Sequence, residues 1–140
     1  MIHLTDEIRM ALNQALANRI FCALATADAQ GMPDVSYRGS VVAWDEEHLV
    51  FWERSRGTAL ENMRENPKVC IMYYNPNNRK FWRFYGRAQL IAEGPERERI
   101  MAAIPEAELE RDPERTGVAV KVALDMVREG PRVIMQRESR

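Results

Sequence analysis

The chain has 140 residues, of which 46% are hydrophobic and 29% charged, and its formal net charge is −1. This length and composition fit one globular domain, residues 1–140, with a hydrophobic core of its own. The near-zero charge gives no bulk attraction to nucleic acid or to an anionic membrane. The longest apolar runs are too short to cross a bilayer, and the first residues lack the form of a signal peptide. We therefore expect a cytoplasmic protein with no membrane association.

The first helix is predicted over residues 6–18, with Thr5 as its N-cap. Its apolar residues recur at helical spacing, which indicates one face packed on the rest of the domain: Ile8, Ala11, Leu12, Ala15 and Leu16. The apolar stretch 20–27 then predicts a strand. The turn that follows contains Gly31, a residue type that adopts positive φ easily.

The second strand is predicted over residues 34–42, antiparallel to the first, and it carries a polar stripe. By the two-residue period of a strand, Ser36, Arg38 and Ser40 share one face. The solvent face of any half-buried strand shows such a stripe, and so does a strand that holds a polar ligand. The local pattern leaves both interpretations open.

The passage from the third strand into the second helix is the best candidate for a ligand site. An apolar strand, residues 49–52, leads into Arg54, Ser55, Arg56, Gly57 and Thr58 and then into a helix that should end before Asn66-Pro67. Two guanidiniums, hydroxyl groups, turn amides and the dipole of the first helical turn would meet there, which suits a phosphate. The alternative is an ordinary loop with solvated arginines and Thr58 as the N-cap.

The second half of the chain predicts three more main strands and one main helix. The strands are predicted at residues 68–74, 79–93 and 118–126, the second of them with or without a bulge, and the helix is predicted at residues 96–104. The charged segment 105–115 is predicted to be a short solvated helix and loop. Gly130-Pro131 should turn the chain into a last short segment at 132–135.

The long strand at 79–93 has two aromatic faces, one with Phe81, Arg83 and Tyr85 and the other with Lys80, Trp82 and Phe84. An arginine between two aromatic rings can stack on a planar ligand while it donates to a phosphate. This suits a flavin, a single-stranded nucleic acid or a dimer interface. The residues alone do not choose among the three.

Cysteine and histidine form no pattern typical of a metal site or of a nucleophilic catalytic site. Cys22 and Cys70 lie far apart in apolar strands, and neither His3 nor His48 has a second histidine or cysteine at ligand spacing. We predict no metal site. If the protein is an enzyme, a cofactor should carry the chemistry.

The order of these segments resembles that of the pyridoxamine 5′-phosphate oxidase-like flavin-binding split barrels, over nearly the whole chain. The most specific pieces are Asn62 to Pro67 followed by a strand, and Arg83 to Ala88 within the long strand. The resemblance implies an α+β, mainly β, fold: a six-stranded antiparallel Greek-key split barrel with flanking helices. It also implies a homodimer that binds FMN at its interface and performs a flavin-dependent redox reaction on a small molecule.

The resemblance assigns cofactor-binding roles by position and identifies no acid or base. The expected cofactor-binding residues are Ser36, Arg38, Ser40, Trp52, Glu53, Arg54, Ser55, Arg56, Thr58, Asn62, Phe81 and Arg83. The chain departs from the true oxidases, because it has no Arg-Pro and Ser-Gln substrate segment and no C-terminal tryptophan. Gly57-Thr58-Ala59 also stands where those enzymes carry the lysine of Ser-Arg-Lys. We therefore do not expect oxidation of pyridoxamine phosphate.

Two other classes of function stay open. One is a non-enzymatic flavin-binding or sensing protein. The other is a small barrel that binds single-stranded nucleic acid through Phe81, Arg83 and Tyr85, although the near-neutral charge disfavours it. Among split barrels a deazaflavin or haem can also replace FMN. Haem is the least expected, because no histidine is positioned to bind iron.

Overall fold

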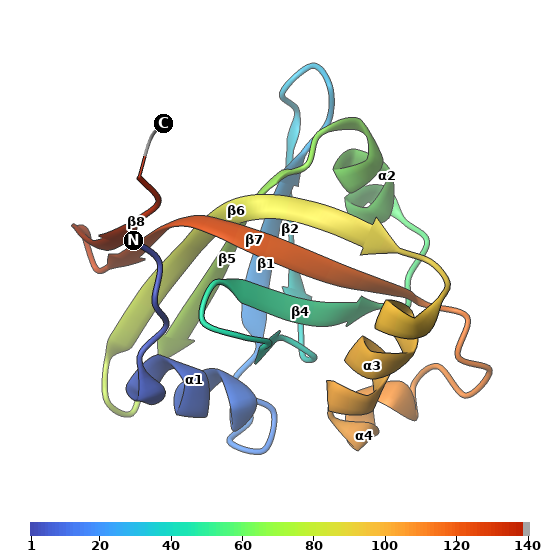
Figure 1. The fold of residues 1–140 in the computed structure, drawn as a ribbon, viewed down its shortest axis with the longest axis horizontal. Coiled ribbons are helices and arrows are strands. Elements are labelled where there is room, and N and C mark those ends of the chain that lie inside the picture. Colours follow the sequence, from blue (N-terminus) through green and yellow to red (C-terminus); the bar gives the residue numbers. More distant parts are fainter. Residues whose placement is uncertain (139–140) are drawn as a thin grey trace.

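A curved antiparallel sheet with four short helices at its edges makes up the protein (Figure 1), as described by a computed structural model over residues 1–138. The elements are α1 (Asp6–Asn13), β1 (Cys22–Ala27), β2 (Pro33–Arg38), β3 (Val42–Ala43), β4 (His48–Glu53), α2 (Thr58–Glu65), β5 (Lys68–Asn75), β6 (Lys80–Ile91), α3 (Pro95–Ala103), α4 (Glu106–Leu109), β7 (Val118–Glu129) and β8 (Arg132–Gln136). The strand order is β2-β1-β5-β6-β7-β4-β3, and β8 pairs with β7. This is the mainly β split-barrel architecture expected from the sequence.

The described residues form eight strands, and the prediction of six was wrong in two places. The strand expected over 34–42 is interrupted at residues 39–41, which gives β2 and the two-residue β3. At this interruption the hydroxyl of Ser40 makes hydrogen bonds with the backbone N and the carbonyl oxygen of Trp52. The second addition is β8, because the chain after Gly130 folds back and pairs with the end of β7.

Helix α1 begins where the sequence predicts and ends five residues earlier. Thr5 caps it, since its Oγ1 accepts a hydrogen bond from the backbone N of Ile8 at 3.2 Å. Asn13, its last residue, accepts a bond from the backbone N of Ala43 at 2.9 Å, which ties the helix end to β3. Residues 14–19 continue as turns, and Ala15 stays buried without being helical.

Helix α2 covers the predicted stretch and ends at Glu65, before the extended Asn66 that precedes Pro67. Its N-cap is Gly57 and not Thr58, which is the first helical residue. Capping by the Thr58 hydroxyl would require Thr58 to be the last residue before the helix, but the helix already includes Thr58. The N-cap residue therefore offers no side-chain acceptor to the first-turn N–H groups.

The core is divided between two clusters of buried side chains. The larger lies inside the curved sheet and under α1, and it includes Leu12, Phe51, Trp82 and Phe84. The smaller lies on the opposite face of β4 and β7, next to α3 and α4 (Figure 1), and consists of Val42, Val50, Trp52, Ile91, Ile100, Ile104, Leu109 and Ala119. The segment 105–115 is therefore not simply solvated as predicted, because Leu109 and Asp112 are buried.

Strand β6 has the two faces that its alternation predicts. Trp82 and Phe84 are fully buried, whereas Phe81, Arg83 and Tyr85 are half-buried on the opposite face. Its register to β7 shifts between Tyr85 and Gly86, so of the two alternatives left open by the sequence the strand is the irregular one. Within residues 1–138, none of the helices is long and apolar enough to cross a membrane.

Candidate functional site

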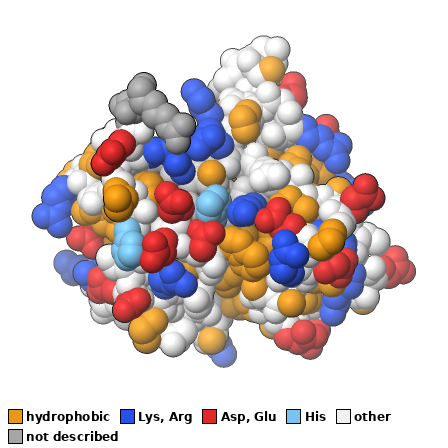
Figure 2. All heavy atoms as spheres, in the orientation of Figure 1, with side chains coloured by type: hydrophobic (Ala, Val, Ile, Leu, Met, Phe, Trp, Pro, Cys, Tyr) orange, Lys and Arg blue, Asp and Glu red, His pale blue; other side chains and the backbone are white. Residues whose placement is uncertain are grey.

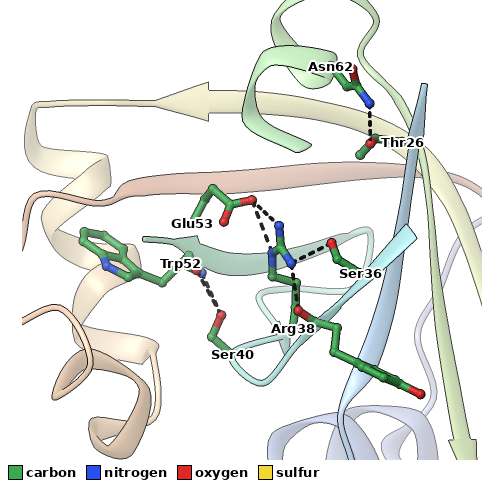
Figure 3. A network of polar contacts seen from close by, with 8 residues as sticks. Thr26, Ser36, Arg38, Ser40, Trp52, Glu53 and Asn62 are labelled. Atoms are coloured by element: carbon green, nitrogen blue, oxygen red, sulfur yellow. Dashed lines mark hydrogen bonds and ion pairs between the residues drawn. The ribbon is translucent and has the colours of Figure 1, made fainter. Parts of the chain in front are cut away.

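The sheet does not close between β2 and β4, and this seam holds the candidate site (Figure 3). β2 lies at one end of the strand order, with β4 and β3 at the other. Ser40 connects the two ends, because its Oγ accepts from the backbone N of Trp52 at 3.0 Å and donates to the carbonyl oxygen of Trp52 at 3.3 Å. Side chains, and not a backbone ladder, therefore bridge the seam.

An ion pair between Arg38 and Glu53 spans the seam (Figure 3). Nε and Nη2 of Arg38 donate to one oxygen, Oε2, of Glu53 at 3.2 and 2.8 Å. Nη1 of Arg38 donates to Oγ of Ser36 at 2.8 Å and to the carbonyl oxygen of Tyr37 at 2.7 Å. The side chains of Glu53 and Arg38 are 2% and 14% exposed. Glu53 thus neutralises most of the charge that Arg38 brings to the site.

On one side of Arg38 lies a space of about 250 Å³ that we call the helix pocket. It is lined by Asp34, Ser36, Arg38, Ser55, Gly57, Thr58, Ala59 and Leu60. Within the described chain no side chain caps α2, so its first-turn N–H groups lack intrahelical partners at this pocket. Those groups and three hydroxyls offer donors to an anion, while Asp34 adds a negative charge. The pocket therefore suits an anion held by hydrogen bonds more than by net charge.

On the other side of Arg38 lies a space of about 300 Å³ that we call the aromatic cleft. It is lined by Phe21, Tyr37, Arg38, Gly39, Trp52, Glu53, Arg54, Ser55, Glu108 and Arg111. Because Arg38 and Ser55 line both spaces, the cleft and the helix pocket adjoin. Its lining combines three aromatic residues with three arginines and two glutamates, so the cleft suits a ligand with both apolar and polar parts.

Trp52 is held in the aromatic cleft by the loop that follows α4. Its Nε1 donates to Oδ2 of Asp112 at 2.9 Å, and the guanidinium carbon of Arg97 lies 4.8 Å from the centre of its ring. Asp112 also accepts from the backbone N–H groups of Thr116 at 3.1 Å and Gly117 at 2.8 Å. Burial raises the pKa of Asp112, but these hydrogen bonds outweigh it and hold the pKa below its ordinary value. The buried acceptor that the indole requires is therefore a charged carboxylate.

Most of the residues predicted to bind a cofactor gather at the seam. Ser36, Arg38, Trp52, Glu53, Arg54, Ser55 and Thr58 line one space or both. Ser40 is buried against Trp52, behind the lining. Arg56 lies on the exposed loop before α2 and donates to the carbonyl oxygen of Thr116 at 3.1 Å.

Asn62, Phe81 and Arg83 lie outside the seam of a single chain. Asn62 is buried and donates to Oγ1 of Thr26 at 3.0 Å, which anchors α2 on β1 (Figure 3). Arg83 is separated from β2 by β1 and β5, three strand spacings or about 14 Å. It packs over Phe81 at 5.3 Å and donates to the carbonyl oxygen of Gly130 at 2.9 Å.

Several lining residues were not predicted from the sequence. Phe21, Tyr37, Gly39, Glu108 and Arg111 belong to the aromatic cleft, and Asp34, Ala59 and Leu60 to the helix pocket. Glu108 and Arg111 lie in the segment predicted to be solvated. The sequence signal that this segment packs on the domain was Leu109, its single large apolar residue. Because Leu109 is buried, the neighbouring Glu108 and Arg111 lie at the cleft.

The chain was compared with protein families and with solved structures. A family profile described as pyridoxamine 5′-phosphate oxidase matches residues 4–124. No curated protein matches the chain. HupZ of Group A Streptococcus is similar in structure, with 21% identity, a TM-score of 0.70 and coverage of 96% of this chain and 99% of HupZ.

Two further structures have different stated activities. An F420 reductase has 18% identity and a TM-score of 0.63, over 89% of this chain and 98% of the reductase. HutZ, described as the heme storage protein of Vibrio cholerae, has 20% identity and a TM-score of 0.62, over 86% and 92% of the two chains. At these identities the likeness shows a shared fold alone. The family follows from the profile, which spans the helices and strands that frame the seam, and the chain belongs to the pyridoxamine 5′-phosphate oxidase family.

Proposed function

We propose that this protein binds FMN and acts as a flavin-dependent oxidoreductase on a small molecule. The observation that carries the proposal is the helix pocket. The N-terminus of α2, whose N-cap is a glycine without a capping side chain, opens on a space of about 250 Å³ that Ser36, Ser55 and Thr58 line. A terminal phosphate is the part of FMN that such a set of donors fits.

The residues present fit the phosphate in a particular way. The first-turn N–H groups of α2 and the three hydroxyls would hold its oxygens, while Arg38 contributes mainly as a donor because Glu53 neutralises it. The nearby Asp34 also opposes a purely electrostatic capture. When bound, FMN would supply the hydride chemistry. The chain's own part is to anchor the phosphate and to offer the adjoining cleft, lined by aromatic and charged residues, to the rest of the molecule.

A homodimer is part of the proposal, and the outer face of the sheet supports it. Val35 and Tyr37 of β2 are 68% and 75% exposed, and Met72 and Tyr74 of β5 are also exposed. The register places Tyr37, Ala23, Met72 and Arg83 in one row across four strands. Tyr37 and Met72 are exposed in this row, whereas Ala23 between them is small and buried and Arg83 is half-buried. Exposed apolar and aromatic residues close to an arginine are typical of a protein interface.

A comparison of FMN with riboflavin tests the phosphate site directly, because the two molecules differ only by the phosphate. We expect FMN to bind at least about tenfold more tightly, in line with several charge-assisted hydrogen bonds. The double variant Ser36→Ala/Thr58→Val should lower FMN affinity toward that of riboflavin and leave riboflavin binding unchanged. Equal affinity for the two flavins in the native protein would refute the phosphate site. The measurement is fluorescence titration of each flavin.

The cofactor and the activity are separated by two further measurements. The visible spectrum of the purified protein, with mass spectrometry of the released chromophore, distinguishes FMN from a deazaflavin and from haem, which a Soret band would reveal. Turnover of a nicotinamide donor and an acceptor by the FMN-loaded protein distinguishes an oxidoreductase from a flavin-binding or sensing protein.

Binding of single-stranded nucleic acid is the weakest candidate function. Cationic and anionic side chains are mixed over the face in Figure 2 without a continuous basic patch.

The dimer is tested by Met72→Lys, which places a charge in the middle of the exposed row. We expect this variant to sediment as a monomer, whereas the control Met10→Lys, also at an exposed methionine but on α1, should behave as the native protein does. Arg83 gives a second test. Since it lies about 14 Å from β2 within one chain, a loss of FMN affinity in Arg83→Ala would support a site completed by a second copy.

A further inference from the structure

Asp34 is the acidic residue in the lining of the helix pocket, and the phosphate site described above gives it no favourable role. Strand β2 presents it on the same face as Ser36 and Arg38, because side chains two residues apart on a strand share a face. Its neighbour across the hairpin is Thr26, whose hydroxyl accepts from Asn62 of α2 (Figure 3). Within residues 1–138 the half-buried Asp34 carboxylate takes part in no hydrogen bond and no ion pair. It is therefore a free acceptor in a pocket otherwise made of donors.

The charges around the helix pocket do not neutralise Asp34. Arg38 is the cation in the pocket lining, and its Nε and Nη2 are bonded to Glu53 at 3.2 and 2.8 Å. Arg38 also lies four residues from Asp34, which is about 13 Å along the strand. Arg54 lines the aromatic cleft instead, and Arg56 donates to a backbone carbonyl oxygen of the loop before β7. One unpaired carboxylate thus lies near the positive end of the α2 dipole.

A ligand that satisfies this pocket must accept hydrogen bonds and donate one. The first-turn N–H groups of α2 and the hydroxyls of Ser36, Ser55 and Thr58 require acceptor oxygens. Asp34 requires a hydrogen. A phosphate monoester supplies both below its second pKa of about 6, because it then keeps one O–H beside its charged oxygens. A sulfate ester has acceptor oxygens alone, so it would leave Asp34 unpaired and be repelled by it.

We propose that Asp34 makes the helix pocket selective for a phosphate monoester that keeps one proton, and that the remaining O–H of the phosphate donates to the Asp34 carboxylate. This inference rests on the proposed function for the place of the phosphate, and it adds which ionic form binds and which anions are rejected. Asp34 is a specificity-determining residue here. It transfers no proton, and no bond of the ligand is broken.

Methyl phosphate and methyl sulfate test the proposal. At about pH 5 both are monoanions of nearly the same shape, and only the phosphate carries an O–H. Each is titrated into the native protein without flavin and followed by the NMR shifts of the backbone N–H groups of residues 58–60. We expect methyl phosphate to bind in the millimolar range that its small size allows, at least about tenfold more tightly than methyl sulfate. Asp34→Asn should abolish this preference, because an amide can donate to either anion.

A change of pH tests the same hydrogen bond without a mutation. Raising the pH from about 5 to about 8 removes the proton of methyl phosphate. The affinity of the native protein should then fall by about tenfold or more, whereas that of Asp34→Asn should not fall. Methyl sulfate keeps its charge over this range, so its titration reports any change in the protein itself. No histidine lines the helix pocket in the part of the chain that the structure describes. A native affinity for methyl phosphate that rises with pH would overturn the proposal.

The matched control is Glu61→Gln, which removes the same charge from an exposed side chain of α2 that pairs with Arg64. It should leave the ratio of the two affinities within about twofold, since a charge screened by solvent acts alike on two monoanions. Equal binding of the two anions by the native protein, no binding of methyl phosphate, or the same change of the ratio in Asp34→Asn and Glu61→Gln would each overturn the proposal.

Titrations of FMN and riboflavin keep this inference separate from the proposed function. Tighter binding of FMN than of riboflavin, together with equal binding of methyl phosphate and methyl sulfate, would overturn the inference alone. The opposite result, a preference for methyl phosphate in a protein that binds the two flavins equally or not at all, would overturn the proposed function alone. The helix pocket would then serve a phosphate monoester other than the flavin.

Discussion

The helix pocket and the aromatic cleft share Arg38 and Ser55, yet they are built in different ways. The helix pocket is assembled mostly from neighbours in sequence: Ser55 and residues 57–60, together with alternate residues of β2. The cleft brings together residues from the start of β1, from β2 and β4, and from α4 near the far end of the chain. The first depends on local backbone geometry, whereas the second depends on long-range packing. Substitutions should therefore affect the two spaces through different physical terms.

The largest expected effect on stability is at the ion pair that separates the two spaces. Glu53→Gln leaves the Arg38 guanidinium nearly buried without a counter-charge, and we expect the free energy of unfolding to fall by about 3 kcal/mol. Urea denaturation at neutral pH measures this loss. In the fraction that stays folded, Arg38 regains its full charge, so the affinity of the helix pocket for FMN should rise.

The control for Glu53→Gln is Glu61→Gln. Glu61 also pairs with an arginine, Arg64 at 3.1 Å, but both side chains are more than half exposed on α2. That substitution should cost less than about 0.5 kcal/mol. A similar cost for the two substitutions would show that the Arg38–Glu53 pair behaves as a surface pair.

The next effect is at Asp112, which supports the cleft from behind. Asp112→Asn removes the charged acceptor of the Trp52 indole and of two backbone N–H groups, and we expect a loss of about 2 kcal/mol at neutral pH. Asp125→Asn is the control, because Asp125 also accepts from arginines but is 39% exposed, and it should cost less than about 1 kcal/mol.

The pH dependence of the Asp112 effect has a defined sign. Its pKa in the folded protein lies below the ordinary value, so its ionised form stabilises the fold above the unfolded pKa of about 3.9. The stability is lost as pH falls through the folded pKa. The difference in unfolding free energy between the native protein and Asp112→Asn should be constant above about pH 5 and shrink below it. A difference that grows on acidification would contradict this assignment.

The contrast between the two spaces also explains what could be predicted from the sequence. The alternation of Ser36 and Arg38 and the loop 54–58 are local signals, and the structure brings Ser55, Gly57 and Thr58 of that loop to the helix pocket with them. Ser40 continues the same alternation, yet the strand is interrupted at residues 39–41, where the Ser40 hydroxyl bonds Trp52, a residue twelve positions away. Glu108 reaches the cleft only because Leu109 packs in the smaller core cluster. Such contacts depend on tertiary packing that the two-residue and 3.6-residue periods do not encode.

Arg83 shows the same limit in another form. Its alternation with Phe81 and Tyr85 is correctly predicted, but its distance from the seam follows from the strand order. The order places β1 and β5 between β6 and β2, although β2 and β6 both carry an arginine on a polar or aromatic face. A sequence pattern gives the face of a strand and not its place in the sheet.

The smallest change in stability is expected at Gly57, where it should accompany a clear change in binding. The φ of Gly57 is −102°, which any residue adopts, and an added Cβ would lie 3.3 Å from Oγ of Ser55, a side chain that can rotate. Gly57→Asp supplies the missing N-cap and should stabilise the free protein by a few tenths of a kcal/mol. The same carboxylate would accept hydrogen bonds from the first-turn N–H groups and repel a phosphate, so FMN affinity should fall by about tenfold or more.

Two further variants serve as controls. Gly57→Ser should also cap the helix, with a smaller loss of FMN affinity. Gly57→Ala adds bulk without a hydrogen-bond acceptor and should leave FMN affinity nearly unchanged. If all three variants bind FMN as the native protein does, the phosphate does not lie at the start of α2, and the cap is bare for a reason unrelated to the ligand.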